Sequence, residues 1–187
     1  MDPSEAREHL DLVEQILTRS DRNVAVIGDL FLIWGMVPAS IDVVIQLVQL
    51  RQLAPVWLWV PFAFLVFAFG YTIVRVRGIK ASADRLTTVT RDYLNVLWVV
   101  YGLTAIMQVA AFRLFPAWSG AALWSLAGAM VTLYIALNGN RVAMLGGCVL
   151  LASLVLAGFV ALPGYVLAGG TLIGYAGFGV ASMLSRK

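Results

Sequence analysis

Residues 30–36 read LFLIWGM, and 67 positions later residues 97–103 read LWVVYGL. Both heptapeptides have leucine first, aromatic residues second and fifth, and glycine sixth. A proline-x-aromatic corner follows each copy, at residues 55–57 and 116–118, and a third corner lies at residues 163–165. We interpret this pattern as a duplicated helical hairpin, followed by a third hairpin that shares only the corner.

The composition indicates a protein embedded in a bilayer. Hydrophobic residues make up 61% of the chain and charged residues 12%, against about 45–50% and 25% in an average soluble domain. A helix of about 20 apolar residues crosses a hydrocarbon core of roughly 30 Å. Six apolar segments of this kind follow one another, at about 23–48, 56–76, 92–112, 117–137, 142–161 and 164–183.

From these segments we predict an all-α integral membrane protein with six transmembrane helices. Short connections on one side favour three sequential antiparallel hairpins, of which the first two are related by a parallel repeat. The distribution of basic residues sets the orientation, since cytoplasmic loops carry an excess of Lys and Arg. Of the 13 basic residues, only Arg51 and Arg113 fall on the other side. We expect a multi-pass protein of the plasma (inner) membrane with both termini and the 75–91 loop in the cytoplasm.

We expect an acidic amphipathic cytoplasmic helix in front of the membrane domain. The chain is therefore divided into this helix, residues 1–22, and the transmembrane domain, residues 23–187. Apolar residues recur at helical spacing from Ala6 to Leu17. Residues 2–22 hold six acids and three bases, whereas residues 75–92 hold five bases and two acids. Membrane-surface helices are usually basic, so we expect residues 2–20 to bind the basic 75–91 loop or a cytoplasmic protein partner. The alternative is a solvated helix that only leads into the first span.

Two acids lie inside the first apolar segment, and ionisable groups in a bilayer are functional candidates. Asp29 lies near its cytoplasmic end and Asp42 lies 13 residues further on. Pro38 precedes Asp42 by four residues and should kink the helix or free a carbonyl. Gln46 follows four residues later on the same face. One interpretation is a polar path along this span that passes Pro38, Asp42 and Gln46, with Asp29 at its inner mouth.

A simpler interpretation assigns both acids to the edges of the membrane. Asp29 would contact cytoplasmic headgroups, and Asp42 would form an ion pair with Arg113 near the outer surface. We favour this interpretation at the sequence level, because both acids lie nearer the edges than the midplane.

Four aromatic residues lie deep in the predicted spans: Trp34, Trp98, Tyr101 and Trp124. We expect them to pack between helices, or to line an apolar cavity. Small residues repeat at four-residue spacing in the last span, as Gly170 with Gly174 and Gly177 with Ala181. Such pairs let helix backbones approach closely. The approach would occur either inside the bundle or between the copies of a homo-oligomer.

Several function classes are disfavoured by what the sequence lacks. His9 is the only histidine and Cys148 the only cysteine, so we expect no catalytic site, no metal site and no cofactor. The basic residues follow the rule for membrane insertion, so we expect the partner to be the lipid bilayer and not a nucleic acid. We expect no enzymatic activity.

The leading hypothesis is a transporter or channel for a small solute or ion. The alternative is a non-catalytic membrane regulator or assembly partner that binds cytoplasmic proteins through residues 2–20 and the 75–91 loop.

Overall fold

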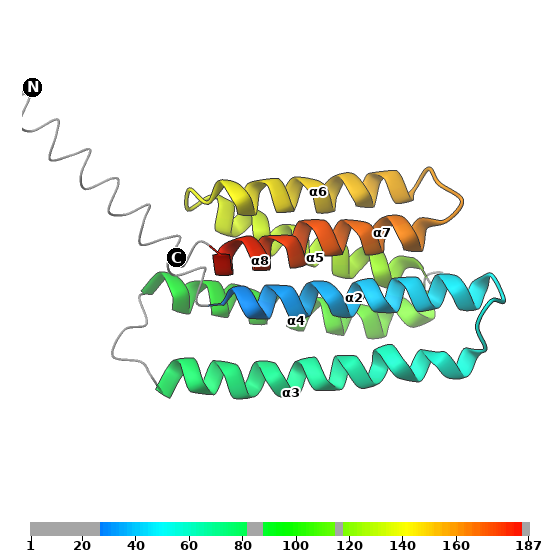
Figure 1. The fold of residues 1–187 in the computed structure, drawn as a ribbon, viewed down its shortest axis with the longest axis horizontal. Helices are drawn as coiled ribbons and strands as arrows, with labels where there is room; N and C mark the ends of the chain where they lie inside the picture. The colour runs from blue at the N-terminus through cyan, green and yellow to red at the C-terminus, as the bar shows by residue number, and fades with distance from the viewer. Residues whose placement is uncertain (1–26, 82–87, 115–117, 185–187) are drawn as a thin grey trace, which may run out of the picture.

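The computed structural model describes residues 27–81, 88–114 and 118–184. These three ranges are almost entirely helical and contain no β-strand (Figure 1). The expected N-terminal helix and residues 82–87 of the basic loop lie outside the described residues, so their predicted association stays a prediction.

Each of the six apolar segments contains one helical rod. The elements in chain order are α2 (Gly28–Gln49), the 3-10 turn η1 (Pro55–Leu58), α3 (Trp59–Ala81), α4 (Thr88–Leu114), α5 (Trp118–Ala136), α6 (Arg141–Ala157), α7 (Pro163–Thr171), the π-helical turn η3 (Leu172–Ala176) and α8 (Gly177–Leu184). Elements α7, η3 and α8 run on as a single rod. Within the described ranges, three segments are long and apolar enough to cross a membrane: Gly28–Gln49, Pro55–Ile79 and Pro163–Leu184.

The helix ends follow from local turn chemistry. Pro55 and Pro163 occupy the first positions of η1 and α7, where the missing N–H of proline costs nothing. Asn140 caps α6, because its side chain accepts a hydrogen bond from the Ala143 N–H at 2.8 Å. Gly139, with φ 92°, allows the tight turn that joins α5 to α6.

Helix α2 and the rod α7–η3–α8 lie against each other at the centre of the bundle. The rod also packs against α6, and α5 packs against both α6 and α4. The Phe31 ring on α2 makes edge contacts with Tyr175 at 5.0 Å and Phe178 at 4.9 Å, measured between ring centroids. Helix α3 lies at the periphery beside α2, and most of its side chains are exposed (Figure 1).

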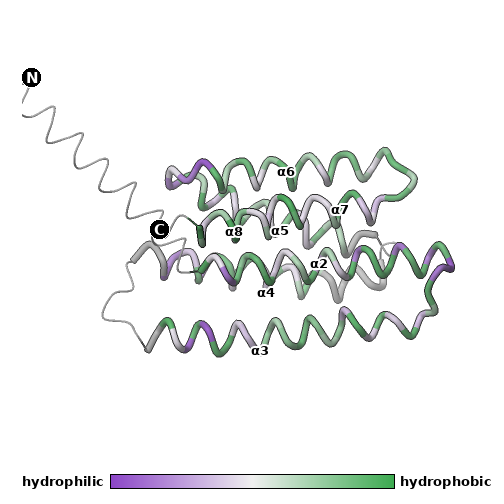
Figure 2. The backbone as a smooth tube through the Cα atoms, viewed as in Figure 1, coloured by the Kyte–Doolittle hydropathy of each residue, from purple (hydrophilic) through white to green (hydrophobic). Residues whose placement is uncertain are grey.

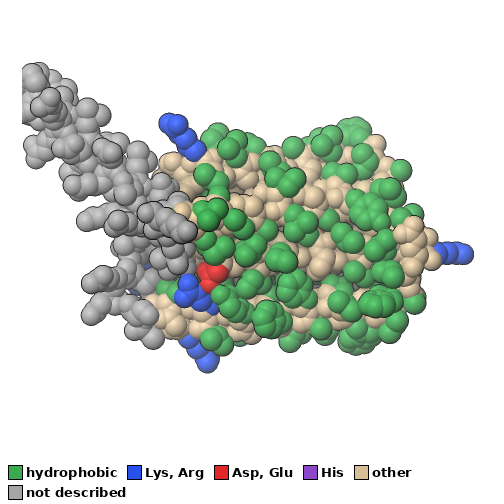
Figure 3. Space-filling view, viewed as in Figure 1, with side chains coloured by type: hydrophobic (Ala, Val, Ile, Leu, Met, Phe, Trp, Pro, Cys, Tyr) green, Lys and Arg blue, Asp and Glu red, His purple; other side chains and the backbone are tan. Residues whose placement is uncertain are grey.

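The outer surface of the bundle is apolar along its length. Hydrophilic segments of the backbone lie mostly near the helix ends (Figure 2). Apolar side chains cover most of the face seen in Figure 3, and the basic side chains on it lie at its two ends. We call the end at which α2 begins the Asp29 end and the opposite end the Gln46 end.

Candidate functional site

Asp42 is buried in the part of the bundle nearer the Gln46 end. Its exposed fraction is 1%, and its Oδ2 atom has no hydrogen-bond partner among the described residues. Pro38, one turn earlier on α2, is also buried. Because proline has no N–H, it cannot donate to the carbonyl of Trp34 as a helical residue would. The helix therefore carries two unusual polar features within one turn of each other.

Gln46 connects α2 to the beginning of α7. Its side chain is buried, and its Oε1 atom accepts a hydrogen bond from the Gly164 N–H at 3.1 Å. Gly164 follows Pro163 in the first turn of α7, where backbone N–H groups lack intrahelical acceptors. The Gln46 side chain therefore caps the first turn of α7 from a distant part of the chain. It also lies one helical turn beyond Asp42 on α2.

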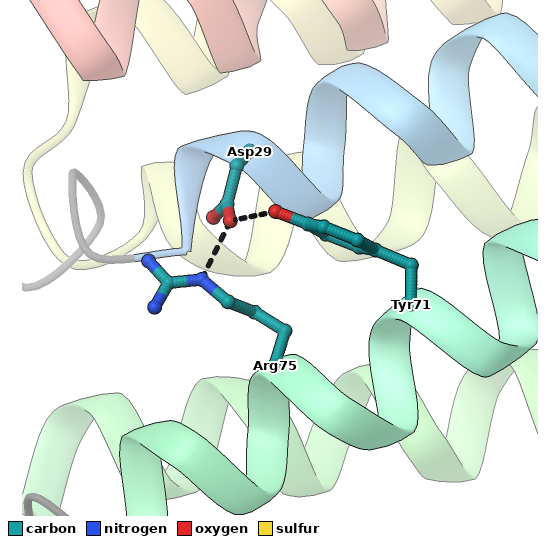
Figure 4. Close-up of polar contacts among 3 residues, drawn as sticks. All are labelled: Asp29, Tyr71 and Arg75. Carbon is teal, nitrogen blue, oxygen red and sulfur yellow. Dashed lines mark hydrogen bonds and ion pairs between the residues drawn. The ribbon is translucent and has the colours of Figure 1, made fainter.

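Asp29 is bonded to α3. Its Oδ2 atom accepts hydrogen bonds from Arg75 Nε at 2.6 Å and from the Tyr71 hydroxyl at 2.7 Å (Figure 4). The side chains of Arg75 and Asp29 are 34% and 21% exposed, so the pair lies at the rim of the bundle. Asp29 thus contacts a neighbouring helix, where the simpler interpretation expected headgroups.

Sequence reasoning did not identify Arg75 or Tyr71 as partners of Asp29. A signal was present, because Tyr71 and Arg75 are four residues apart and so share one face of α3. In an antiparallel pair the end of α3 lies opposite the beginning of α2, which places that face beside Asp29. The expected pair of Asp42 with Arg113 stays a prediction, because the Arg113 side chain lies outside the described part of the chain.

Three of the four deep aromatic residues form one stack. The Trp34 ring stacks on Tyr101 at 5.4 Å and on Trp124 at 6.2 Å, and Tyr101 stacks on Trp124 at 5.5 Å. We call these three residues the aromatic stack. Trp34 and Tyr101 occupy equivalent positions of the sequence repeat, so the two copies meet there. Trp98 is 41% exposed on α4 and lies outside the stack.

The indole of Trp34 is held by a hydrogen bond as well as by ring contacts. Its Nε1–H donates to Thr72 Oγ1 on α3 at 2.9 Å. The Thr72 hydroxyl in turn donates to the carbonyl of Ala68 at 2.7 Å. Together with the bonds of Asp29, this contact joins α3 to α2 through polar side chains.

The small residues of the last rod differ in their surroundings. A Cβ atom added at Gly170 would collide with the Ser153 side chain, and one added at Gly174 would lie 2.6 Å from the Gly146 carbonyl oxygen. Both positions therefore allow the rod to approach α6 closely inside the chain. Gly177 is exposed with no neighbour closer than 3.6 Å to such an atom, and Ala181 is half-buried.

Two further close approaches join α2 to the rod, at Gly35, which is the glycine of the sequence repeat, and at Gly28, which the sequence pattern did not single out. A Cβ atom at Gly35 would lie 2.5 Å from the backbone nitrogen of Ala176, and one at Gly28 would lie 2.9 Å from the carbonyl oxygen of Gly179. The glycines of this interface lie on different helices, so a search for spacing within one helix does not detect them.

Comparisons with protein-family models, with curated proteins and with solved structures found no match. The site must therefore be interpreted from its own chemistry. Across the described ranges, no group of three His, Cys, Asp or Glu side chains could hold a metal ion. Two carboxyl oxygens are buried without a hydrogen-bond partner among the described residues, Asp29 Oδ1 and Asp42 Oδ2. Asp29 is bonded to Arg75 and Tyr71 through its other oxygen. Asp42 has no ion-pair partner among the described side chains, and it lies between the aromatic stack and the contact of Gln46 with Gly164.

Proposed function

We propose that this chain is a six-span inner-membrane protein that moves a small solute or ion across the bilayer, with Asp42 as its binding carboxyl. The six helical rods and the many exposed apolar side chains that they carry support the six spans. The excess of basic residues in the predicted cytoplasmic segments supports an orientation with both termini inside.

The burial of Asp42 without a partner for Oδ2 is the observation that carries this proposal. A buried carboxylate costs several kcal/mol unless a partner or water compensates it. A chain that used Asp42 only for packing would be more stable with an apolar residue of similar size. Retention of an acid at this depth is therefore best explained by a ligand that binds to it.

One contact between helices lies on each side of Asp42 along α2. Trp34 lies eight residues before Asp42 on α2, so the aromatic stack is about 12 Å away toward the Asp29 end. Gln46 lies four residues beyond Asp42, which places its bond to Gly164 about 6 Å away toward the other end. We propose that transport opens one of these two contacts at a time.

This proposal shortens the polar path expected from the sequence. Asp29 is bonded to Arg75 and Tyr71, which gives it a structural role at the rim. The proposed path then consists of Pro38, Asp42 and Gln46. Gly170 and Gly174 make their close approaches within one chain, so they do not support a homo-oligomer.

Purified protein in lipid vesicles tests this function. We expect stopped-flow light scattering to show faster relaxation than in empty vesicles for at least one of the probes glycerol, urea, NaCl and KCl. Asp42→Asn should lower that rate at least tenfold. Asp92→Asn is the matched control, since Asp92 is exposed on α4 and the chemical change is the same. Relaxation that Asp42→Asn leaves unchanged would contradict the proposal. Relaxation that equals that of empty vesicles for all four probes, together with proton uptake no faster than in empty vesicles, would contradict it as well.

A second proposal is that the chain binds a cytoplasmic protein at its Asp29 end. Arg77 and Arg91 are exposed there, whereas Arg75 is bonded to Asp29. If residues 2–20 and these arginines form a docking surface, deletion of residues 2–20 should abolish co-purification of the partner while the purified chain keeps its helical circular dichroism. Unchanged co-purification would exclude the helix from that surface.

A further inference from the structure

The surroundings of Asp42 do not resemble a metal-cation site. The described acids are Asp29, Asp42 and Asp92. Asp29 lies 13 residues from Asp42, about 20 Å along the helix, and Asp92 is exposed on α4. Hard cations such as Ca²⁺ and Mg²⁺ take six or more oxygen ligands, several of them from carboxylates or water. A proton needs only one oxygen atom, and Asp42 Oδ2 has no other partner.

No positive charge among the described side chains reaches Asp42 from the neighbouring elements. Helix α2 is contacted by α3, η1, α5, α7, η3 and α8, and by α4 through the aromatic stack. The charged or titratable side chains described on these elements are Tyr71, Arg75 and Arg77 on α3, Tyr134 on α5, Tyr165 on α7, Tyr175 on η3, and Arg91, Asp92, Tyr93 and Tyr101 on α4. Neither η1 nor α8 carries one.

Most of these groups lie toward the Asp29 end. Arg75 and Tyr71 are bonded to Asp29, and Arg77 lies two residues further along α3. Tyr134 packs against Tyr93 near the start of α4. The rings of Tyr175 and Tyr101 pack beside Phe31 and Trp34. Toward the Gln46 end lie Tyr165, next to Gly164, and Arg51, in the turn after α2, and both are exposed.

We infer that the ion bound at Asp42 is a proton, and that transport by this protein carries protons. The inference rests on the proposed function and names the ion for the same site. On this inference the carboxyl is the neutral acid in this conformation, because its charged form would be buried without an ion-pair partner among the described side chains and without any described partner at Oδ2. In transport, the O–H bond forms with a proton from water on one side and breaks to release that proton to water on the other. No other bond changes.

Proton uptake into vesicles that contain the full-length protein tests the inference. The vesicles hold potassium and the dye pyranine, and are diluted into potassium-free and sodium-free buffer at equal pH. Valinomycin then creates a potential, negative inside, that draws protons inward. We expect acidification at least tenfold faster than in empty vesicles. Asp42→Asn should abolish this excess, Asp92→Asn should leave it unchanged, and Asp42→Glu should retain a measurable part of it.

Labelling with a hydrophobic carbodiimide gives a second measurement that needs no variant. These reagents react with protonated carboxyl groups in apolar surroundings. Peptide mass spectrometry of the labelled wild-type chain should find an adduct on Asp42 and none on Asp29, whose carboxylate is paired with Arg75. The proton assignment is overturned if Asp42 remains unlabelled, or if proton uptake in the wild type does not exceed that of empty vesicles.

The two measurements separate this inference from the proposed function. Labelling of Asp42 in a protein that moves neither protons nor any solute probe would overturn the transport function, and with it proton transport, although Asp42 would be a protonated carboxyl. Solute flux that depends on Asp42, without proton uptake and without labelling, would preserve transport and overturn the proton assignment. Flux that appears only when sodium is added would overturn it as well.

Discussion

The two halves of α2 differ in how many of their side chains and glycines are bonded or closely packed against other helices. In the half at the Asp29 end, Asp29 is bonded to Arg75 and Tyr71, and the Trp34 indole is bonded to Thr72. Gly28 and Gly35 bring the backbone of the same half against the last rod. In the other half, Asp42 Oδ2 has no partner among the described residues, and the Gln46 side chain accepts a hydrogen bond from the Gly164 N–H of α7.

This difference indicates which half of α2 holds the bundle together and which half can bind a ligand. Groups that are bonded or closely packed against another helix resist change, because each loss leaves a buried polar atom or a steric conflict. A buried carboxyl with a free oxygen has no such partner to lose. The four predictions that follow test this contrast.

Gly35→Leu should have the largest effect on stability. The new side chain would have to occupy the space of the Ala176 backbone, whose nitrogen lies 2.5 Å from the position of a Cβ atom at Gly35. Overpacking of this kind typically costs about 1–3 kcal/mol, and we expect a value near the upper limit. Reversible unfolding with sodium dodecyl sulfate in mixed micelles, followed by circular dichroism, measures the free energy.

Gly102→Leu is the matched control for that substitution. Gly102 is the repeat equivalent of Gly35, is exposed, and has no atom within 4 Å of an added Cβ. We expect a change in unfolding free energy of less than about 0.5 kcal/mol. Equal effects of the two substitutions would contradict the close contact of α2 with the last rod.

The Asp29 and Arg75 side chains should be energetically coupled. A double-mutant cycle of Asp29→Asn and Arg75→Gln isolates the pair from other contacts. Because both groups are partly exposed, we expect a coupling energy of about 1 kcal/mol, near the upper limit for surface pairs. A coupling energy indistinguishable from zero would show that α3 is held to α2 by other contacts.

Thr72→Val should have a smaller effect, because it removes a single hydrogen bond between helices. The Nε1–H of Trp34 would lose its acceptor, at a cost of about 0.6 kcal/mol, the average for such bonds in a membrane protein. Trp34→Phe removes the donor of the same hydrogen bond, so in the Thr72→Val background it should not lower the unfolding free energy by the hydrogen-bond contribution a second time. If the losses of unfolding free energy from the two substitutions simply add, the two side chains are not coupled and the hydrogen bond is contradicted.

Asp42→Asn should have the smallest effect on unfolding. No described partner is lost, and asparagine has nearly the same shape as the neutral acid, so we expect a change below about 0.5 kcal/mol. A loss of more than 2 kcal/mol would indicate that Asp42 is bonded to a group such as Arg113, as the simpler interpretation of the sequence proposed.

Helical structure and its boundaries were largely predictable, because long apolar segments admit few alternatives. Proline at residues 55 and 163 marked the first turns of η1 and α7. The π-helical turn Leu172–Ala176 was not predicted. It depends on how the rod fits against α2 and α6, and a hydropathy pattern contains no information about that fit.

The site was predictable only in part. Asp42, Gln46 and Trp34 were identified from depth and spacing, whereas their partners were not. Nothing in the sequence marks Gly164 or Thr72 as a partner, because only the fold brings them beside Gln46 and Trp34. Trp98 was grouped with the other deep aromatics because the sequence gives its depth but not the direction in which it points.

The protonation state of Asp42 is the most direct test of this account. Infrared spectra of the purified wild-type protein and of Asp42→Asn, recorded at neutral pH in the same lipid, differ at the carbonyl stretch of a protonated carboxylic acid. We predict that this band is present in the wild type, shifts to lower frequency in deuterated buffer, and is absent from Asp42→Asn. A wild-type spectrum that lacks the band would mean that Asp42 is ionised and paired, and would contradict the account.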